Sequence, residues 1–292
     1  MEFLFSLLTG FALPALPTLV GWVVWLSLLG LLVYNLYRWR GYRIPWKVRE
    51  TWLLVGFLFL TLIASPFIYR LPFTSARAFP GLPAFAPGSA LMPFFGIPWT
   101  LGAALLGPLG GIILGAFAGL VRGAVDSYTL FSVIELAMMG SWYAVNTRQR
   151  YRTPAYGFLR QPLVSALILV PFHTLFYVIA SLFTQWGADV STPIAARLDF
   201  ALSNAGIVTL LFGSEMLVAG TIGQVFAQAF PGRFIANQTL QPSPGERSLE
   251  TRFLSATGTF ISLLLLTLLV GDWFVAGRSA RDMLHDRLSS AA

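Results

Sequence analysis

The chain has 292 residues, of which 56% are hydrophobic and 11% are charged. Soluble domains carry about 25% charged residues, so this composition excludes a single water-soluble core and predicts that the chain is embedded in a lipid bilayer. The formal net charge is +7 and the sequence contains no cysteine, which excludes a disulfide framework and a thiolate metal site.

The first apolar stretch, residues 3–14, lacks Lys and Arg and is too short to cross a membrane. We expect an interfacial or re-entrant segment there, separated by Pro14 and Pro17 from the first span. Runs of about 20 apolar residues then predict an all-α, polytopic transmembrane bundle of about eight spans. Their expected ranges are 16–37, 51–69, 90–106, 108–124, 127–146, 162–185, 200–228 and 253–275.

The third predicted span contains two prolines, Pro93 and Pro98, which predict a kinked helix because each removes a backbone hydrogen bond. Phe94, Phe95 and Trp99 would line that kink. One interpretation is a pocket near the membrane midplane. The alternative is a belt of aromatic side chains at the membrane surface.

The fourth predicted span is rich in glycine. Its glycines stand four residues apart, so they share one face of a helix and let a neighbouring helix approach closely. We expect this helix to be the innermost of the bundle, joined to the third span at Gly107–Pro108 with almost no loop. The glycines predicted to pack are Gly107, Gly111, Gly115, Gly119 and Gly123.

Polar and ionisable side chains within the predicted spans are the candidate ligand-binding residues, because such groups are costly in lipid. Aromatic residues beside a kinked helix are a second source of candidates. The candidates are Trp99, Arg122, Glu135, His173, Asn204 and Glu215.

Arg122 and Asp126 end the glycine-rich span on its outer side, and Glu135 lies about 12 Å deep in the next span. One prediction is an Arg122–Glu135 ion pair that bridges the two helices. The alternative is that Arg122 reaches the lipid headgroups and Glu135 is protonated. Glu215 has no evident cationic partner at its depth, so it is either a protonated, hydrogen-bonded residue or a ligand contact. We expect His173 to be neutral and hydrogen-bonded, and we predict no metal and no cofactor.

The basic residues predict the orientation in the membrane. Lys47 is the only lysine, and twelve of the 19 basic residues fall in the loops 38–50, 146–161 and 229–252. These loops lie on one side of an eight-span bundle, which the positive-inside rule places in the cytoplasm. The prediction is a bacterial cytoplasmic membrane protein with both termini outside, whose arginines contact lipid and not nucleic acid.

The residues after the last predicted span, 277–292, have apolar positions at helical spacing with charges between them. They predict the start of an extracytoplasmic amphipathic helix, or of a following domain, beyond a transmembrane bundle of residues 1–276. The alternative is a frayed polar tail.

Four residues, Gly107, Pro108, Gly111 and Arg122, occur in the order typical of a Gly-Pro turn, a glycine-spaced helix and an arginine at its far end. In this respect residues 88–146 resemble the membrane module of LytS-type sensor histidine kinases. The chain has GIPWTLG where that family has Asp-x-Arg before the turn, and GAVDSYT where Gly-Gly follows the arginine. Membrane subunits of ECF-type vitamin importers are similar in their Gly-Pro-x-x-Gly helices.

The sequence contains no GxSxG, HExxH or phosphate-loop motif, so we do not expect an enzyme. The leading prediction is a membrane-embedded sensory input region that binds a small ligand or senses the state of the membrane, and that pairs with a second copy through its membrane region. The runner-up is a substrate-binding membrane subunit of an ECF-type or other transporter. A third interpretation is a structural membrane protein whose polar residues only hold helices together.

Overall fold

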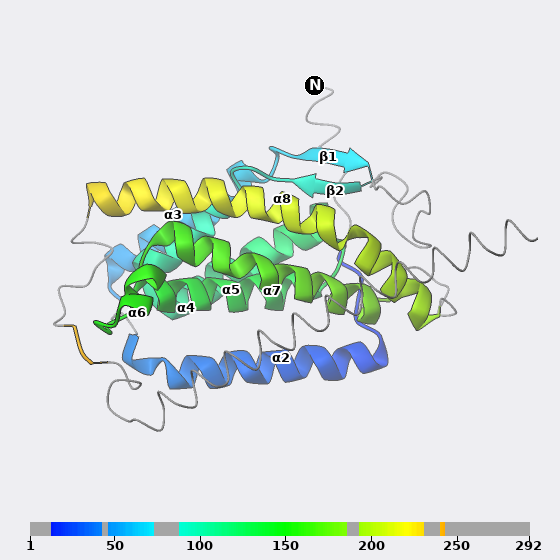
Figure 1. The fold of residues 1–292 in the computed structure, drawn as a ribbon, viewed down its shortest axis with the longest axis horizontal. Coiled ribbons are helices and arrows are strands. Elements are labelled where there is room, and N and C mark those ends of the chain that lie inside the picture. Colours follow the sequence, from blue (N-terminus) through cyan, green and yellow to red (C-terminus); the bar gives the residue numbers. More distant parts are fainter. Residues whose placement is uncertain (1–12, 43–45, 73–87, 186–192, 231–239, 243–292) are drawn as a thin grey trace, which may run out of the picture. The chain divides into compact units, whose positions relative to one another are not determined.

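The computed structural model of the chain describes residues 13–42, 46–72, 88–185, 193–230 and 240–242 (Figure 1). The chain divides into two compact units. The main unit holds nearly all described residues. The described residues of the smaller unit are 151–153 and 240–242, which meet in a parallel bridge between Tyr151 and Gln241. The predicted span 253–275, the tail 277–292 and most of the apolar stretch 3–14 lie outside the described residues.

The main unit is predominantly helical. Four of its helices, α2, α4, α7 and α8, are long and apolar enough to cross a membrane, which confirms a helical protein with candidate membrane spans. The elements are α2 (Leu19–Arg38), η1 (Arg40–Tyr42), α3 (Val48–Ala64), β1 (Tyr69–Pro72), β2 (Gly88–Leu91), α4 (Gly96–Val125), α5 (Phe131–Thr147), α6 (Pro154–Leu159), α7 (Pro162–Phe183) and α8 (Ile194–Ala229).

Helix α4 is a hairpin of two arms and not one straight rod. Gly107 has φ 76° and ψ −171°, a left-handed conformation that favours glycine, and it interrupts the helix just before Pro108. A Cβ placed on Gly111 would lie 3.1 Å from the Cβ of Ala103, whereas residues eight apart in a straight helix are about 12 Å apart. The chain therefore reverses at Gly107, as the sequence predicts for this almost loopless joint.

The two prolines of the predicted third span do not kink it. Pro93 precedes α4, and Pro98 lies in its first turn, where the missing N–H has no helical partner in any case. The prediction of a kink there is wrong, because the break falls at Gly107 instead. The first arm runs only from Gly96 to Leu106, since the residues before it turn or are extended.

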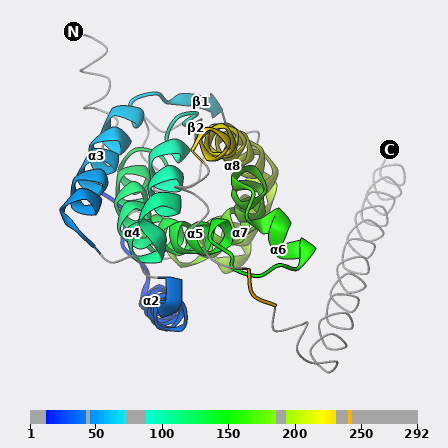
Figure 2. The ribbon, with the colours of Figure 1, turned by 90° about the vertical axis from the view of Figure 1, so that its left-hand side faces the viewer.

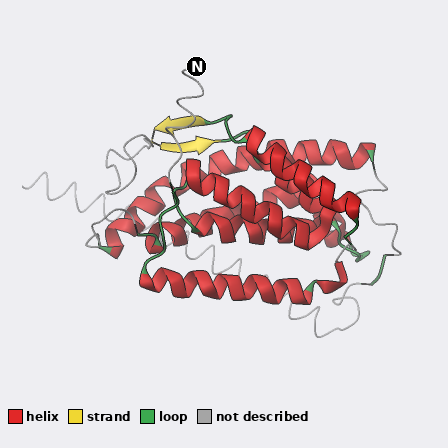
Figure 3. Cartoon of the chain, turned by 180° about the vertical axis from the view of Figure 1, so that it is seen from behind, coloured by secondary structure: helices red, strands yellow, loops and turns green. Residues whose placement is uncertain are grey.

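Residues 69–72 and 88–91 form a small antiparallel sheet that the helical pattern did not predict. Tyr69 pairs with Leu91, and Pro72 pairs with Gly88. Figure 3 shows these two strands in yellow against the helices in red. The sheet shortens two predicted spans, because α3 already ends at Ala64.

The glycines of the second arm bring α4 and α5 into direct backbone contact. At three positions an added Cβ would collide with a carbonyl oxygen of α5: Gly111 faces Gly140, Gly115 faces Leu136, and Gly119 faces Ser132. This confirms close packing on a side-chain-free face. Gly107 does not belong to that face because it forms the hairpin turn, whereas Gly123 lies beside the carbonyl of Thr129.

The α4–α5 pair is central in the main unit. Helices α3 and α8 contact α4, while α2 and α7 contact α5, as the end-on view in Figure 2 shows. Helices α7 and α8 also pack extensively on each other. The side chains that α4, α5, α7 and α8 bury between them form the candidate site.

Candidate functional site

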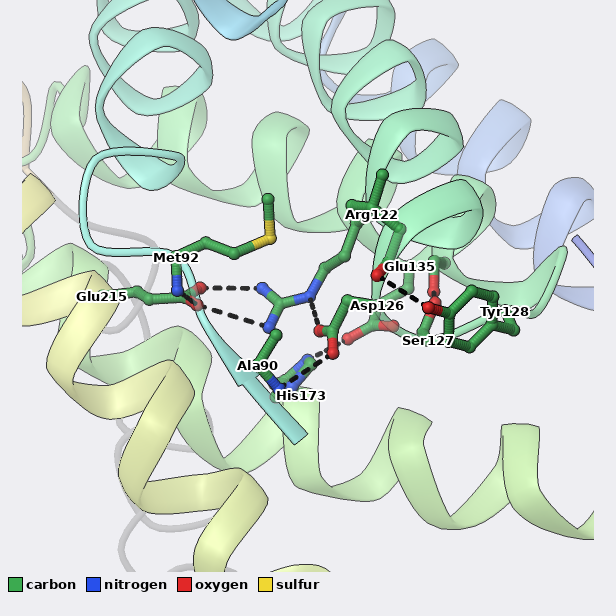
Figure 4. Close-up of polar contacts among 11 residues, drawn as sticks. Ala90, Met92, Arg122, Asp126, Ser127, Tyr128, Glu135, His173 and Glu215 are labelled. Atoms are coloured by element: carbon green, nitrogen blue, oxygen red, sulfur yellow. Dashed lines mark hydrogen bonds and ion pairs between the residues drawn. The ribbon is translucent and has the colours of Figure 1, made fainter. Parts of the chain in front are cut away.

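Arg122 is the centre of a buried ionic cluster at the end of the second arm of α4 (Figure 4). Its Nε donates to Oδ2 of Asp126 at 3.0 Å, and its Nη1 donates to Oε2 of Glu215 in α8 at 2.8 Å. Asp126 stands four residues after Arg122, a spacing that puts both side chains on one face of a helix. Arg122 is 4% exposed and Glu215 is fully buried, so this ion pair is shielded from solvent.

The carboxylates of Asp126 and Glu215, which bind Arg122, each also accept a hydrogen bond from the backbone just before α4. The Met92 N–H donates to Oε1 of Glu215 at 2.7 Å, and the Ala90 N–H donates to Oδ1 of Asp126 at 3.0 Å. Each carboxylate thus joins the guanidinium to the chain that leads into the first arm, Asp126 at strand β2 and Glu215 at the residue directly after it. The cluster ties the small sheet to α4 and α8.

The turn that follows Asp126 is held in an unusual backbone conformation. Tyr128 has φ 51°, which is uncommon for a residue with a side chain. Its hydroxyl donates to the Val125 carbonyl at 3.1 Å, and its own carbonyl accepts from the Ala15 N–H at 2.8 Å. The chain before α2 therefore fixes the turn that carries Asp126.

A second buried pair lies next to the cluster. Oε1 of Glu135 in α5 is hydrogen-bonded to Nδ1 of His173 in α7. The His173 ring stacks on Phe212 of α8, with ring centroids 3.8 Å apart and an interplanar angle of 22°. The Arg122 guanidinium lies 5.3 Å from the centre of the same Phe212 ring. Phe212 therefore contacts both Arg122 and His173.

These contacts correct the pairing expected from the sequence. The predicted Arg122–Glu135 pair is wrong, since Arg122 binds Glu215 and Asp126 while Glu135 binds His173. Glu215 does have a cationic partner, although the two residues are 93 positions apart. The two residues lie far apart in sequence and meet because α8 packs against α4.

The structure brings together four of the six candidate residues, namely Arg122, Glu135, His173 and Glu215. Asn204 lies about 16 Å from Glu215 along α8, and its amide donates to the Phe200 carbonyl at 2.9 Å. Trp99 is buried in the first arm, edge-on to Tyr143 of α5, with ring centroids 6.5 Å apart.

Two members of the site, Asp126 and Phe212, were not among the candidates. The signal for Asp126 was present, because it follows Arg122 by four residues at the end of a helix. Phe212 carries no such signal, since one more phenylalanine in an apolar helix is indistinguishable from a packing residue. The backbone donors of Ala90 and Met92 were hidden because a helical span, kinked at Pro93 and Pro98, was expected over residues 90–106.

The site contains more acidic side chains than basic ones. Three carboxylates, those of Asp126, Glu135 and Glu215, face one guanidinium and one imidazole. Uncompensated charge is costly in a low-dielectric interior, so this excess favours binding of positive charge or protons. Among the described residues, no group of three or more His, Cys, Asp or Glu side chains has an arrangement that could hold a metal ion.

At the other end of the hairpin, Arg148 caps the first arm. Its Nε donates to the Ala104 carbonyl at 2.7 Å and its Nη2 donates to the Leu105 carbonyl at 3.1 Å. Pro108 cannot donate to Ala104 because it has no N–H. Burial, and to a lesser extent the charge of Arg150, lower the pKa of Arg148 to about 10, so the guanidinium still carries its charge at neutral pH.

Comparison of the chain with models of protein families, with curated proteins and with solved structures found no match. The resemblance of residues 88–146 to LytS-type membrane modules therefore stays a prediction. Function is inferred below from the geometry and charge of the cluster.

Proposed function

We propose that the chain is the membrane-embedded sensory input region of a bacterial signal-transduction protein, which binds a small polar ligand at the Arg122 cluster. The proposal includes about eight spans in the cytoplasmic membrane, with both termini outside. The observation that carries it is the buried Arg122–Glu215 pair, with its Asp126 and backbone partners. Ion pairs inside membrane proteins are rare and mark functional positions.

The contacts suggest how binding is transmitted. A ligand with a charged group competes either for the Arg122 guanidinium or for the carboxylates of Asp126 and Glu215. When these carboxylates move, the backbone N–H groups of Ala90 and Met92 lose their acceptors. The segment before α4 and helix α8 then shift relative to the second arm. The α4–α5 pair is the fixed support, because its glycines already place the two backbones in contact. We place the moving contact at the cluster and not along the glycine face.

The test measures binding and movement on the same protein. The full chain, reconstituted in nanodiscs, is screened by thermal shift against a panel of amino acids, carboxylic acids, amines and nucleosides. Spin labels on Phe94→Cys and Leu210→Cys, both exposed positions, then report the distance between the segment before α4 and α8. Since the chain has no native cysteine, no background substitution is needed.

We expect at least one compound that raises the melting temperature and also changes the label distance. Arg122→Gln should abolish both effects, while Arg40→Gln, at an exposed position, should retain them. A compound that binds without any change in distance would contradict the sensory role. Cross-linking between two copies, with and without that compound, tests the proposed homodimer.

The short first arm favours a second candidate function, a substrate-binding membrane subunit of an ECF-type or other small-molecule transporter. The arm, Gly96 to Leu106, is roughly 16 Å long, about half the thickness of the hydrocarbon core. Interrupted helices of this kind occur beside binding sites in transporters. Co-purification of an ATPase pair, or uptake of the bound compound into proteoliposomes, would favour this candidate over the sensor.

A further inference from the structure

The net charge of the buried side chains points to a binding site for a proton. With a neutral imidazole, Asp126, Glu135 and Glu215 leave a net charge of −2 beside Arg122, and protonation of His173 reduces it to −1. A low-dielectric interior penalises such an excess, so the site favours uptake of a proton. The remaining question is which group takes it up.

We propose that the Glu135–His173 pair is an exchangeable proton-binding site inside the helix bundle. The hydrogen bond between Nδ1 of His173 and Oε1 of Glu135 keeps one proton between the two side chains. The exchangeable proton is the second one, which binds Nε2 and converts the neutral imidazole into an imidazolium beside the Glu135 carboxylate. Histidine is the side chain suited to this exchange near neutral pH.

The two carboxylates that bind Arg122 already have two hydrogen-bond donors each. Glu215 and Asp126 each accept one bond from the guanidinium and one from a backbone N–H. Hydrogen bonds of this kind stabilise the ionised form of a carboxylate. Within the described part of the chain, Glu135 is instead hydrogen-bonded to His173, which is itself titratable. We therefore assign the exchangeable proton to the pair, whose histidine makes its hydrogen bond outside the Arg122 cluster.

Charged and titratable groups from all four neighbouring helices face the pair. Helix α4 contributes Arg122 and Asp126, α8 contributes Glu215, and α5 contributes Glu135 itself. Helix α7 adds Tyr177, one turn beyond His173. The carboxylates favour the imidazolium, whereas the Arg122 guanidinium opposes it.

Phe212 links the proton site to Arg122, because its ring stacks on His173 and lies under the guanidinium. Any ligand that withdraws a carboxylate from Arg122 changes the electric field at His173, and therefore the proton affinity of the pair. By linkage, proton uptake at the pair changes the affinity of that ligand for the Arg122 cluster by the same factor. The proton site goes beyond the proposed sensory role, since it exists whether or not a small ligand binds.

The chain contains only two histidines, so the His285→Gln variant leaves His173 as the sole imidazole. This variant, labelled with ¹⁵N-histidine and held in nanodiscs without added ligand, is titrated between about pH 5 and pH 9 by NMR. We expect the Nε2 resonance to change from the neutral to the protonated position within that range. In a Glu135→Gln background the midpoint should fall by about one pH unit or more, because the anion that favours the imidazolium is gone.

Glu50→Gln makes the same chemical change in the first turn of α3 and should leave the midpoint unchanged. If Glu135→Gln does not fold, Glu135→Asp keeps the carboxylate, and the His173 titration should remain. A resonance that stays in one protonation state throughout the range would overturn the proposal. So would a midpoint that is the same with and without the Glu135 carboxylate. Because no ligand is present, either outcome leaves the sensory proposal to its own test.

Discussion

Arg122 and Glu215 lie 93 residues apart in the sequence, yet their side chains form a fully buried ion pair with a 2.8 Å contact. The contact joins the second arm of α4 to the middle of α8. Breaking a buried pair by removing one partner strands the other charge, and this is costly in a low-dielectric interior. The pair is thus both a structural link and the part of the protein most sensitive to a competing charge.

The effects of neutralising the two members of this pair should not be additive. We expect Arg122→Gln or Glu215→Gln alone to lower the free energy of unfolding by about 3–5 kcal/mol, and the double variant to lose less than the sum. Arg49 and Glu50 form the matched control, a surface pair at 3.8 Å whose arginine is 66% exposed, where each change should cost less than about 1 kcal/mol. Reversible denaturation in mixed micelles measures all of these. Strict additivity at Arg122 and Glu215 would count against a direct coupling.

The glycine contact between α4 and α5 predicts that alanine destabilises the fold at Gly115 but not at Gly30. A Cβ on Gly115 would collide with the Leu136 carbonyl, so Gly115→Ala should separate the helices and cost about 1–3 kcal/mol. Gly30 in α2 has no atom within 4 Å of the added Cβ, and Gly30→Ala should be neutral or stabilise by up to about 1 kcal/mol. Thermal unfolding in nanodiscs compares the two variants. Equal melting temperatures would show that the backbones are not in contact at Gly115.

The reversal of α4 depends on Gly107 and on Arg148. Gly107→Ala should cost about 1–2 kcal/mol, because a side chain disfavours φ 76°. Arg148→Gln should cost about 1–3 kcal/mol, since it leaves the carbonyls of Ala104 and Leu105 without this donor. Spin labels on the two arms, measured by electron resonance, check that the hairpin stays closed in the native chain. A long distance between the arms would refute the reversal.

Single cysteine substitutions test the predicted orientation of the chain in the membrane. Gly41 and Asp199 are both exposed, and by the positive-inside rule Gly41 faces the cytoplasm while Asp199 faces the outside. In intact cells an impermeant maleimide should label Asp199→Cys, and it should reach Gly41→Cys only after the membrane is opened. The reverse pattern would invert the topology, and labelling of both sites in intact cells would contradict the predicted spans between them.

Several elements followed from the sequence with good accuracy. Residues 16–37, 108–124 and 162–185 were expected as spans and correspond to α2, the second arm of α4, and α7. The hairpin at Gly107–Pro108 was also predicted, because a glycine followed by a proline cannot continue a helix without a break. These features are local, so the residues that cause them lie within a few positions of one another.

The partners of the buried charges were not predictable in this way. Arg122 and Glu135 were compared because their helices follow one another, but α8 and α7 supply the partners that the structure shows. Strand β2 was missed because Gly88–Leu91 reads as the beginning of an apolar run. The backbone donors Ala90, in this strand, and Met92, directly after it, were therefore absent from the predicted site.

The sequence by itself determined that the protein is helical and apolar, where its chain reverses, and which ionisable side chains lie within its apolar helices. Composition and spacing are sufficient for this, since each run needs only its own residues to form a helix or a turn. Tertiary structure decided that Arg122 binds Glu215 and that Glu135 binds His173. A buried charge pairs with whichever opposite charge the packing of distant helices brings within hydrogen-bond distance, and no local pattern specifies that packing.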